Sequence, residues 1–288
     1  MKPLFKWSGG KSKEIPVLDK YKPNYFNTYF EPFIGGGAVW LHLNNPNNIV
    51  GDNFVELINL YQSVKTHKEK IIDFINNVVN TYNNEVINLE TLPVAVWRKR
   101  QFDKIANEFY YRYRDNDFDG EFENALKFYL LRQLSFSGML RFSQAGKFNI
   151  PFGWYRRLKV LEYGEDFYNL LDNTQFILGD WNDTVKNATK QDFVFLDPPY
   201  TRKFQQYSPY GTFGDDEHIK LLEWFKGTTS RSLIILNKDD FTYPLYKNYI
   251  VEEYDKKYSI QYRDRMTSED SNSVHFVAIN YDPLANFA

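Results

Sequence analysis

The chain contains 288 residues, with a formal net charge of -2 and 43% hydrophobic residues, which suits one large α/β domain carrying an insertion or two smaller domains. It contains no cysteine, which excludes disulfides, thiolate catalysis and cysteine-ligated zinc, and its four histidines lack metal-ligand spacing. No apolar run is long enough to span a bilayer and no signal-peptide core is present, so we expect a cytoplasmic protein that is not membrane-bound.

Apolar runs and turn signals predict strands that alternate with helices, a pattern typical of a mostly parallel sheet. The alternation breaks over residues 65–172, which we interpret as a domain inserted into one formed by residues 1–64 and 173–288. In chain order we expect a strand at 29–33, a helix from 38, a strand at 48–51, a helix at 55–64, broken helices over 68–114, a helix at 124–134, a β-hairpin or ordered loop over 137–153, strands at 176–178 and 193–196, a helix at 216–225, and strands at 232–236 and 274–281.

The first predicted strand runs into a glycine-rich turn, with the sequence EPFIGGG at residues 31–37. Glycines permit positive φ angles and close approach of the backbone to a ligand. Asp52 ends the next strand, where an acidic residue can accept hydrogen bonds from ribose hydroxyls. The pattern indicates a nucleotide-like cofactor. The GxGxxG of nicotinamide enzymes is absent. The GKS at residues 10–12 follows no strand, which argues against a P-loop.

The sequence DPPY at residues 197–200 directly follows the apolar run at 193–196. A buried strand of this kind delivers the tetrapeptide to its carboxyl end, where open α/β sheets bind ligands. It offers an acceptor carboxylate, a stiff turn and an aromatic face. Those groups together suit an exocyclic amine on a flat heterocycle.

A basic segment lies between these two motifs. Residues 127–161 carry seven Lys or Arg residues and no Asp or Glu, and many aromatic residues lie among them. Phosphate binding requires only such a local patch, not a basic protein. The alternative interpretation is a solvated basic face.

Four segments in this order resemble the Dam family, the S-adenosylmethionine-dependent DNA adenine-N6 methyltransferases of the α type. They are FKWSGGK at 5–11, EPFIGGG at 31–37, the pair FSGMLRF at 136–142 and FNIPFG at 148–153, and DPPY at 197–200. The resemblance covers roughly residues 4–281. It implies a Rossmann-like class I methyltransferase fold with a mixed, mostly parallel sheet, and a helical and β-hairpin target-recognition domain in the insertion.

The resemblance also implies a role for individual residues. The catalytic motif is Asp197, Pro198, Pro199 and Tyr200. The residues implied to bind S-adenosyl-L-methionine are Trp7, Lys11, Glu31, Phe33, Gly35, Gly37, Asp52, Asp180 and Asp197. The residues implied to bind double-stranded DNA are Lys6, Phe136, Ser137, Arg141, Pro151, Tyr155, Arg156 and Arg157. No metal is implied.

In this scheme the target adenine is flipped out of the duplex, Phe136 wedges into the gap, and Arg141 reads a guanine edge. Lys6 and Arg141 together suggest GATC as the target. Ser137 departs from the asparagine of the best-known members, which puts in doubt how the unpaired partner base is held. A cognate restriction endonuclease is a further partner to expect, and a monomer suits an enzyme that must release DNA.

Other functions remain open at this point. DPPY chemistry also permits methylation of cytosine N4, RNA or a protein glutamine. A relative that binds DNA but has lost catalysis is a second alternative, and a nicotinamide enzyme is a remote third.

Overall fold

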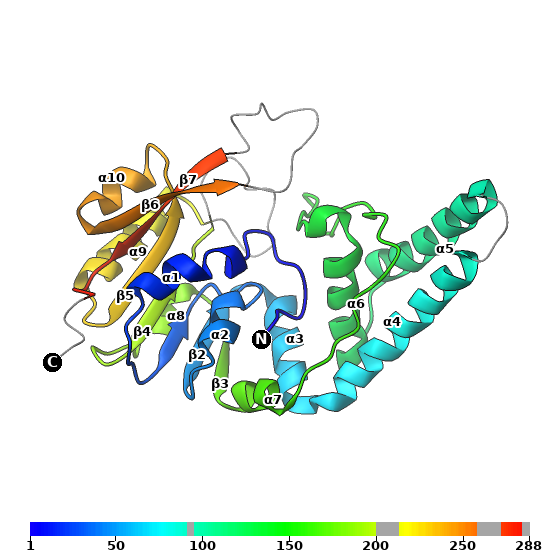
Figure 1. Ribbon diagram of the computed structural model, residues 1–288, viewed down its shortest axis with the longest axis horizontal. Helices are drawn as coiled ribbons and strands as arrows, with labels where there is room; N and C mark the ends of the chain where they lie inside the picture. The colour runs from blue at the N-terminus through cyan, green and yellow to red at the C-terminus, as the bar shows by residue number, and fades with distance from the viewer. Residues whose placement is uncertain (91–94, 200–212, 258–271, 284–288) are drawn as a thin grey trace.

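The computed structural model describes residues 1–90, 95–199, 213–257 and 272–283, and shows one seven-stranded sheet of order β3-β2-β1-β4-β5-β7-β6 (Figure 1). Strands β1 to β5 pair in parallel, whereas β7 pairs antiparallel with β5 and β6 pairs antiparallel with β7. This confirms the predicted mixed, mostly parallel sheet. The strands are β1 (Tyr29–Glu31), β2 (Asn48–Asp52), β3 (Thr174–Leu178), β4 (Phe193–Leu196), β5 (Arg231–Asn237), β6 (Ile250–Lys257) and β7 (Asn272–Ile279).

Helices cover both faces of the sheet and extend well beyond one end of it (Figure 1). They are α1 (Ile15–Tyr21), α2 (Ala38–Leu43), α3 (Val55–His67), α4 (Glu69–Glu90), α5 (Ala95–Asp115), α6 (Glu121–Leu134), α7 (Glu165–Asp172), α8 (Trp181–Val185), α9 (Asp215–Gly227) and α10 (Thr242–Tyr246), with short 3-10 turns η1 (Lys11–Lys13), η2 (Phe136–Gly138) and η3 (Lys247–Tyr249). Within the described residues no helix is long and apolar enough to cross a membrane.

The two faces of the sheet belong to separate apolar clusters. In β4, Phe193 and Phe195 join one cluster while Val194 and Leu196 join the other, because successive side chains of a strand point to opposite faces. Helices α8, α9 and α10 cover the second face. The central strands are therefore buried on both sides, as their continuous apolar sequence indicates.

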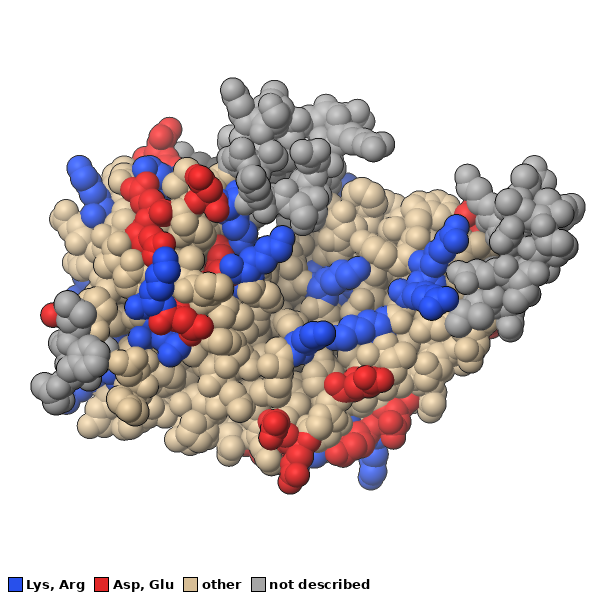
Figure 2. All heavy atoms as spheres, in the orientation of Figure 1, with Lys and Arg blue, Asp and Glu red and all other residues tan. Residues whose placement is uncertain are grey.

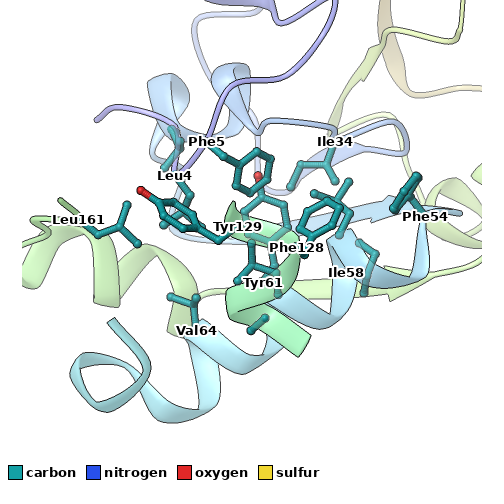
Figure 3. Packing of buried hydrophobic residues seen from close by; sticks show 14 of the residues in the cluster. Leu4, Phe5, Ile34, Phe54, Ile58, Tyr61, Val64, Phe128, Tyr129 and Leu161 are labelled. Atoms are coloured by element: carbon teal, nitrogen blue, oxygen red, sulfur yellow. The ribbon is translucent and has the colours of Figure 1, made fainter. Parts of the chain in front are cut away.

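The apolar cluster on the first face continues from the sheet into α4, α5 and α6 without a break. Figure 3 shows how residues far apart in sequence meet there. The ring of Phe5 meets the ring of Phe128 edge-on, with centroids 5.7 Å apart, and lies 5.9 Å from Tyr61 of α3. The proposed insertion thus shares a core with the sheet domain.

Several element boundaries differ from the prediction for identifiable reasons. β1 ends at Glu31 rather than at Phe33, because Pro32 has no N–H to donate to a neighbouring strand. The segment predicted as a β-hairpin or an ordered loop is a loop closed by two single bridges, Ser135 with Phe152 and Phe142 with Phe148, and not two regular strands.

Candidate active site

A cavity of about 580 Å³ lies at the carboxyl ends of the parallel strands. The strand order reverses between β1 and β4, since β2 and β3 lie on one side of this pair and β5 on the other. Open α/β sheets bind ligands at such a switch point. Every residue that the resemblance assigned to the cofactor lines this cavity: Trp7, Lys11, Glu31, Phe33, Gly35, Gly37, Asp52, Asp180 and Asp197.

Four adjacent parallel strands each deliver one carboxyl group to the cavity. Glu31 and Asp52 are the last residues of β1 and β2, Asp180 follows β3, and Asp197 follows β4 directly. The Asp180 side chain also caps helix α8, because its Oδ1 accepts the backbone N–H of Asn182 at 3.0 Å. Asp180 therefore both caps α8 and lines the cavity.

The glycine turn after β1 is packed directly beneath Trp7. Gly35 has a φ of 46°, and a Cβ at this position would lie 2.5 Å from Trp7 Nε1. The turn is tied down by two hydrogen bonds: Asp52 Oδ2 accepts from the Gly35 N–H at 3.1 Å, and Tyr61 donates to the Gly35 carbonyl at 3.0 Å. Only glycine combines this conformation with this close approach.

Two carboxyl groups at the strand ends, Glu31 and Asp52, have raised pKa values. Burial raises the pKa of Glu31 well above its usual range, and the charge of Asp197 raises it further, although a hydrogen bond from Tyr29 opposes this. Burial also raises the pKa of Asp52 to about 6, against backbone hydrogen bonds that lower it. Both groups therefore favour a ligand that brings positive charge or hydrogen-bond donors.

Lys11 is buried, with 4% of its side chain exposed, and is not the surface charge that a lysine usually is. Its Nζ donates to Asp197 Oδ2 at 2.5 Å and to the Gly9 carbonyl at 3.1 Å. The ion pair joins the amino-terminal motif to the segment that follows β4. It fixes the orientation of the Asp197 carboxylate in the cavity.

Behind Lys11 lies a buried carboxylate, Glu14, which is 2% exposed. Its Oε1 accepts from Tyr254 at 2.7 Å and lies 3.0 Å from His275 Nδ1, while Oε2 lies 2.6 Å from Lys256 Nζ and 4.0 Å from Lys11 Nζ. Burial alone would raise the pKa of Glu14, but these partners lower it to about 2. Glu14 thus connects the β6–β7 pair to the Lys11–Asp197 ion pair.

The remainder of the DPPY motif is described only in part. Pro198 is buried and Pro199 is exposed at the mouth of the cavity, and both line it. Tyr200 lies outside the described residues. Both prolines have a fixed φ, which stiffens the turn that carries Asp197.

The FSGMLRF segment forms a turn beside the cavity in which Phe136 is exposed, Gly138 and Phe142 are buried and the other residues are half-buried. Phe136 is 46% exposed, and Ser137 has a φ of 54°. The Phe136 N–H donates to the carbonyl of Pro151, itself exposed, at 2.9 Å. Arg141 is held by Asn149: its Nε donates to Asn149 Oδ1 at 2.8 Å and its Nη2 to the Asn149 carbonyl at 3.0 Å.

Part of the basic segment is exposed and adjoins Lys6, whereas Lys127 and Arg141 are half-buried. Lys6, Arg156 and Arg157 are exposed, and Lys6 Nζ lies 4.0 Å from the centre of the Tyr155 ring. Figure 2 shows Lys and Arg side chains across the middle and right of the view, whereas Asp and Glu lie along the lower edge and, mixed with further Lys and Arg, at the left. The prediction was wrong for Arg132, which is fully buried and donates to the Lys6 carbonyl at 2.9 Å.

Sequence reasoning missed several aromatic residues that line the cavity. Phe54 follows β2, Phe142 comes from the recognition segment, and Trp181 and Phe213 lie on the side of α8 and α9. Phe213 meets Phe33 edge-on at 5.4 Å. Such residues carry no motif, because any apolar residue near a strand end has the same local pattern. They give the cavity flat apolar walls in addition to its carboxylates.

Comparisons with known proteins agree with this arrangement. The family model described as D12 class N6 adenine-specific DNA methyltransferase matches residues 7–264. The protein named Type II methyltransferase M.CviBI, from Paramecium bursaria Chlorella virus NC1A, is 34% identical, over 98% of this chain and 100% of its own. The protein named DNA adenine methylase from Haemophilus influenzae is 29% identical, over 75% of this chain and 69% of its own. The chain therefore belongs to the D12 class of N6 adenine-specific DNA methyltransferases.

Proposed function

We propose that this enzyme takes its methyl group from S-adenosyl-L-methionine and transfers it to N6 of an adenine that is flipped out of duplex DNA, within the sequence GATC. The observation that carries the proposal is the position of Asp197. Its carboxylate lies in the same cavity as the glycine turn, on the neighbouring strand of the sheet. A base amine held by Asp197 and a cofactor held by the turn would therefore meet.

The residues of the cavity suit this cofactor. Glu31 suits the amino group of its methionine part, Asp52 its ribose hydroxyls, and Asp180 its adenine. The glycine turn admits the methionine part close to the backbone. When bound, S-adenosyl-L-methionine supplies an electrophilic methyl group on a sulfonium.

Adenine N6 is a poor nucleophile because its lone pair is delocalised into the ring. Asp197 and the Pro198 carbonyl can each accept one N6 hydrogen, which concentrates electron density on nitrogen and stabilises the developing positive charge. Lys11 orients the carboxylate for this task. We assign the aromatic face that stacks on the base to Tyr200. The chemistry rests on positioning and electrostatics, with no covalent enzyme intermediate.

We assign the DNA contacts to the exposed surface beside the cavity. Phe136 wedges into the gap left by the adenine, at a cost of unstacking of about a few kcal/mol. Arg141 reads a guanine edge and Lys6 the outer base pair, which is the basis for GATC. Arg156 and Arg157 contact phosphate, which positions the protein but does not specify a sequence.

The remaining DNA-facing positions complete the surface. Tyr155 and Pro151 contact the duplex beside the recognised bases, and Ser137 lies next to the wedge. We propose residues 65–172 as the recognition insertion and the two flanking segments as the catalytic domain. Because one chain carries the whole site, we propose a monomer. The names of the type II relatives lead us to propose a partner endonuclease that cleaves the same sequence.

The first test is long-read sequencing of plasmid DNA from methylase-free cells that express the chain. N6-methyladenine confined to GATC supports the proposal, whereas methylation at another motif refutes the assignment of Lys6 and Arg141. The matched variant is Asp197→Ala, which we expect to abolish methyl transfer while DNA binding persists. If DNA binding is lost to the same degree, Asp197 has a structural role instead.

A further inference from the structure

Trp154 is an exposed aromatic residue in a strained backbone conformation. Its side chain is 53% exposed, and its φ is 60°. A positive φ is a genuine outlier for a bulky residue, and strain of this kind persists only where the surroundings impose it. A glycine or asparagine would satisfy the backbone here without that strain. Folding alone therefore gives no reason for a tryptophan at this position.

The surrounding chain forces the conformation. Gly153 donates its N–H to the Leu134 carbonyl at 2.7 Å, and a Cβ on Gly153 would lie 2.5 Å from Tyr155 Cε2 and 2.9 Å from the Ser135 carbonyl oxygen. The chain is thus pinned against the end of α6 just before Trp154 turns outward. The indole keeps one ring contact, with Phe152, at a centroid distance of 5.4 Å.

The exposed indole belongs to the surface assigned above to DNA. Next to it in the chain is Tyr155, whose ring lies under Lys6 Nζ, and then the exposed Arg156. Phe136 lies at the other end of the same bridged pair, since Phe136 pairs with Pro151 and Leu134 with Gly153. Trp154 follows Gly153 just beyond these paired residues, on the side away from Phe136.

This position decides what Trp154 can touch. Phe136, and not Trp154, is the residue assigned to the gap left by the adenine, so Trp154 faces base pairs outside that gap. The bases there remain stacked inside the duplex and offer no free face. Their edges stay accessible in the grooves, but deoxyribose and phosphate are the better match for the flat apolar ring and the single N–H donor of an indole.

We propose that Trp154 is a further DNA-contact residue, which packs its indole on the deoxyribose–phosphate backbone flanking the recognition site and donates its N–H to a phosphate. The inference rests on the proposed function. Because the contact is neutral and touches no base edge, it adds affinity for every sequence alike. It releases no counterion, which separates it from the contacts of Arg156 and Arg157.

The test uses the full-length protein with the variant Trp154→Asn, since asparagine tolerates a positive φ. Dissociation constants are measured on a GATC duplex and on a scrambled duplex, each over a range of salt concentrations. We expect both constants to rise about fivefold to tenfold, as for the loss of one hydrogen bond and its packing, with an unchanged salt slope. Tyr25→Ala, at an aromatic residue that is 83% exposed away from this surface, should change neither constant.

Other outcomes overturn the inference in distinguishable ways. A loss confined to the GATC duplex would make Trp154 a base-reading residue. A lower melting temperature with unchanged DNA affinity would make it structural. If the wild-type protein itself neither binds nor methylates the duplex, the proposed function fails. If the wild type does both and Trp154→Asn matches it, this inference alone fails.

Discussion

Replacement of Gly35 by alanine tests the packing of the glycine turn against Trp7. The left-handed conformation of Gly35 costs an alanine about 1–2 kcal/mol. The added Cβ would also lie 2.5 Å from Trp7 Nε1 and 2.8 Å from Trp7 Cδ1, and overpacking of this kind costs about 1–3 kcal/mol. We therefore expect Gly35→Ala to lower the free energy of unfolding by about 2–5 kcal/mol, a large share of a typical domain's stability.

Substitutions of two other glycines separate the cost of the backbone conformation from the cost of steric overlap with Trp7. Gly9 has a φ of 79°, but no atom lies within 4 Å of the position that a Cβ would occupy, so Gly9→Ala should show the conformational cost alone, about 1–2 kcal/mol. Gly227, at the end of α9, has neither problem, and Gly227→Ala should be neutral or stabilising. Urea unfolding gives the three free energies, and calorimetry with S-adenosylhomocysteine gives the binding constants.

We expect Gly35→Ala to weaken binding of S-adenosylhomocysteine as well as to lower stability, because Trp7 must move out of the cavity wall. Gly227→Ala should bind it as the wild type does. Equal losses in the free energy of unfolding for Gly35→Ala and Gly9→Ala would refute this expectation, since they would show that Trp7 moves aside at no energetic cost.

Three further predictions concern single side chains. Lowering the pH through about 6 protonates Asp52 and should weaken binding of S-adenosylhomocysteine. The variant Asp52→Asn should bind this ligand weakly at every pH. Calorimetry of the wild type and the variant across this pH range measures both effects. The pKa of Glu14 is lowered to about 2 from its usual 4.5, which stabilises the fold by about 3 kcal/mol above pH 4.5. That stabilisation is lost as the pH falls toward 2. Glu14→Gln should remove it at all pH values, as denaturant unfolding would show. Arg141→Ala should lose about 1–3 kcal/mol of discrimination at one base pair, measured as methylation rates on singly substituted duplexes; a uniform loss would indicate a phosphate contact.

The sequence predicted the strands whose residues are apolar on both faces and missed the charged edge strand β6. Residues 193–196 and 232–236 have the continuous apolar composition of buried parallel strands, and they are β4 and most of β5. The residues of β6 are largely charged from Glu252 onward, because β6 is the last strand of the sheet and edge strands tolerate charge. Helices α8 and α10 are too short to show a helical period.

For the site, the sequence predicted positions but not partners. Motifs at strand ends are local, so Glu31, Asp52 and Asp197 could be placed at one edge of the sheet from their neighbours alone. The ion pair between Lys11 and Asp197 joins residues that are far apart in the chain, so no local sequence pattern indicates it. The burial of Arg132 could not be predicted either, because the sequence of a basic segment does not distinguish a buried cation from exposed ones.

The core that runs from the sheet into α4, α5 and α6 limits how this enzyme can acquire a new recognition sequence. A segment with its own closed core could be exchanged between relatives as a cassette. Here an exchange of residues 65–172 would also replace Phe128 and Tyr129, which pack with Phe5 and Tyr61 of the other segment (Figure 3). On the recognition roles proposed above, a new target would be reached more readily by substitutions between Phe136 and Trp154 than by recombination of whole segments.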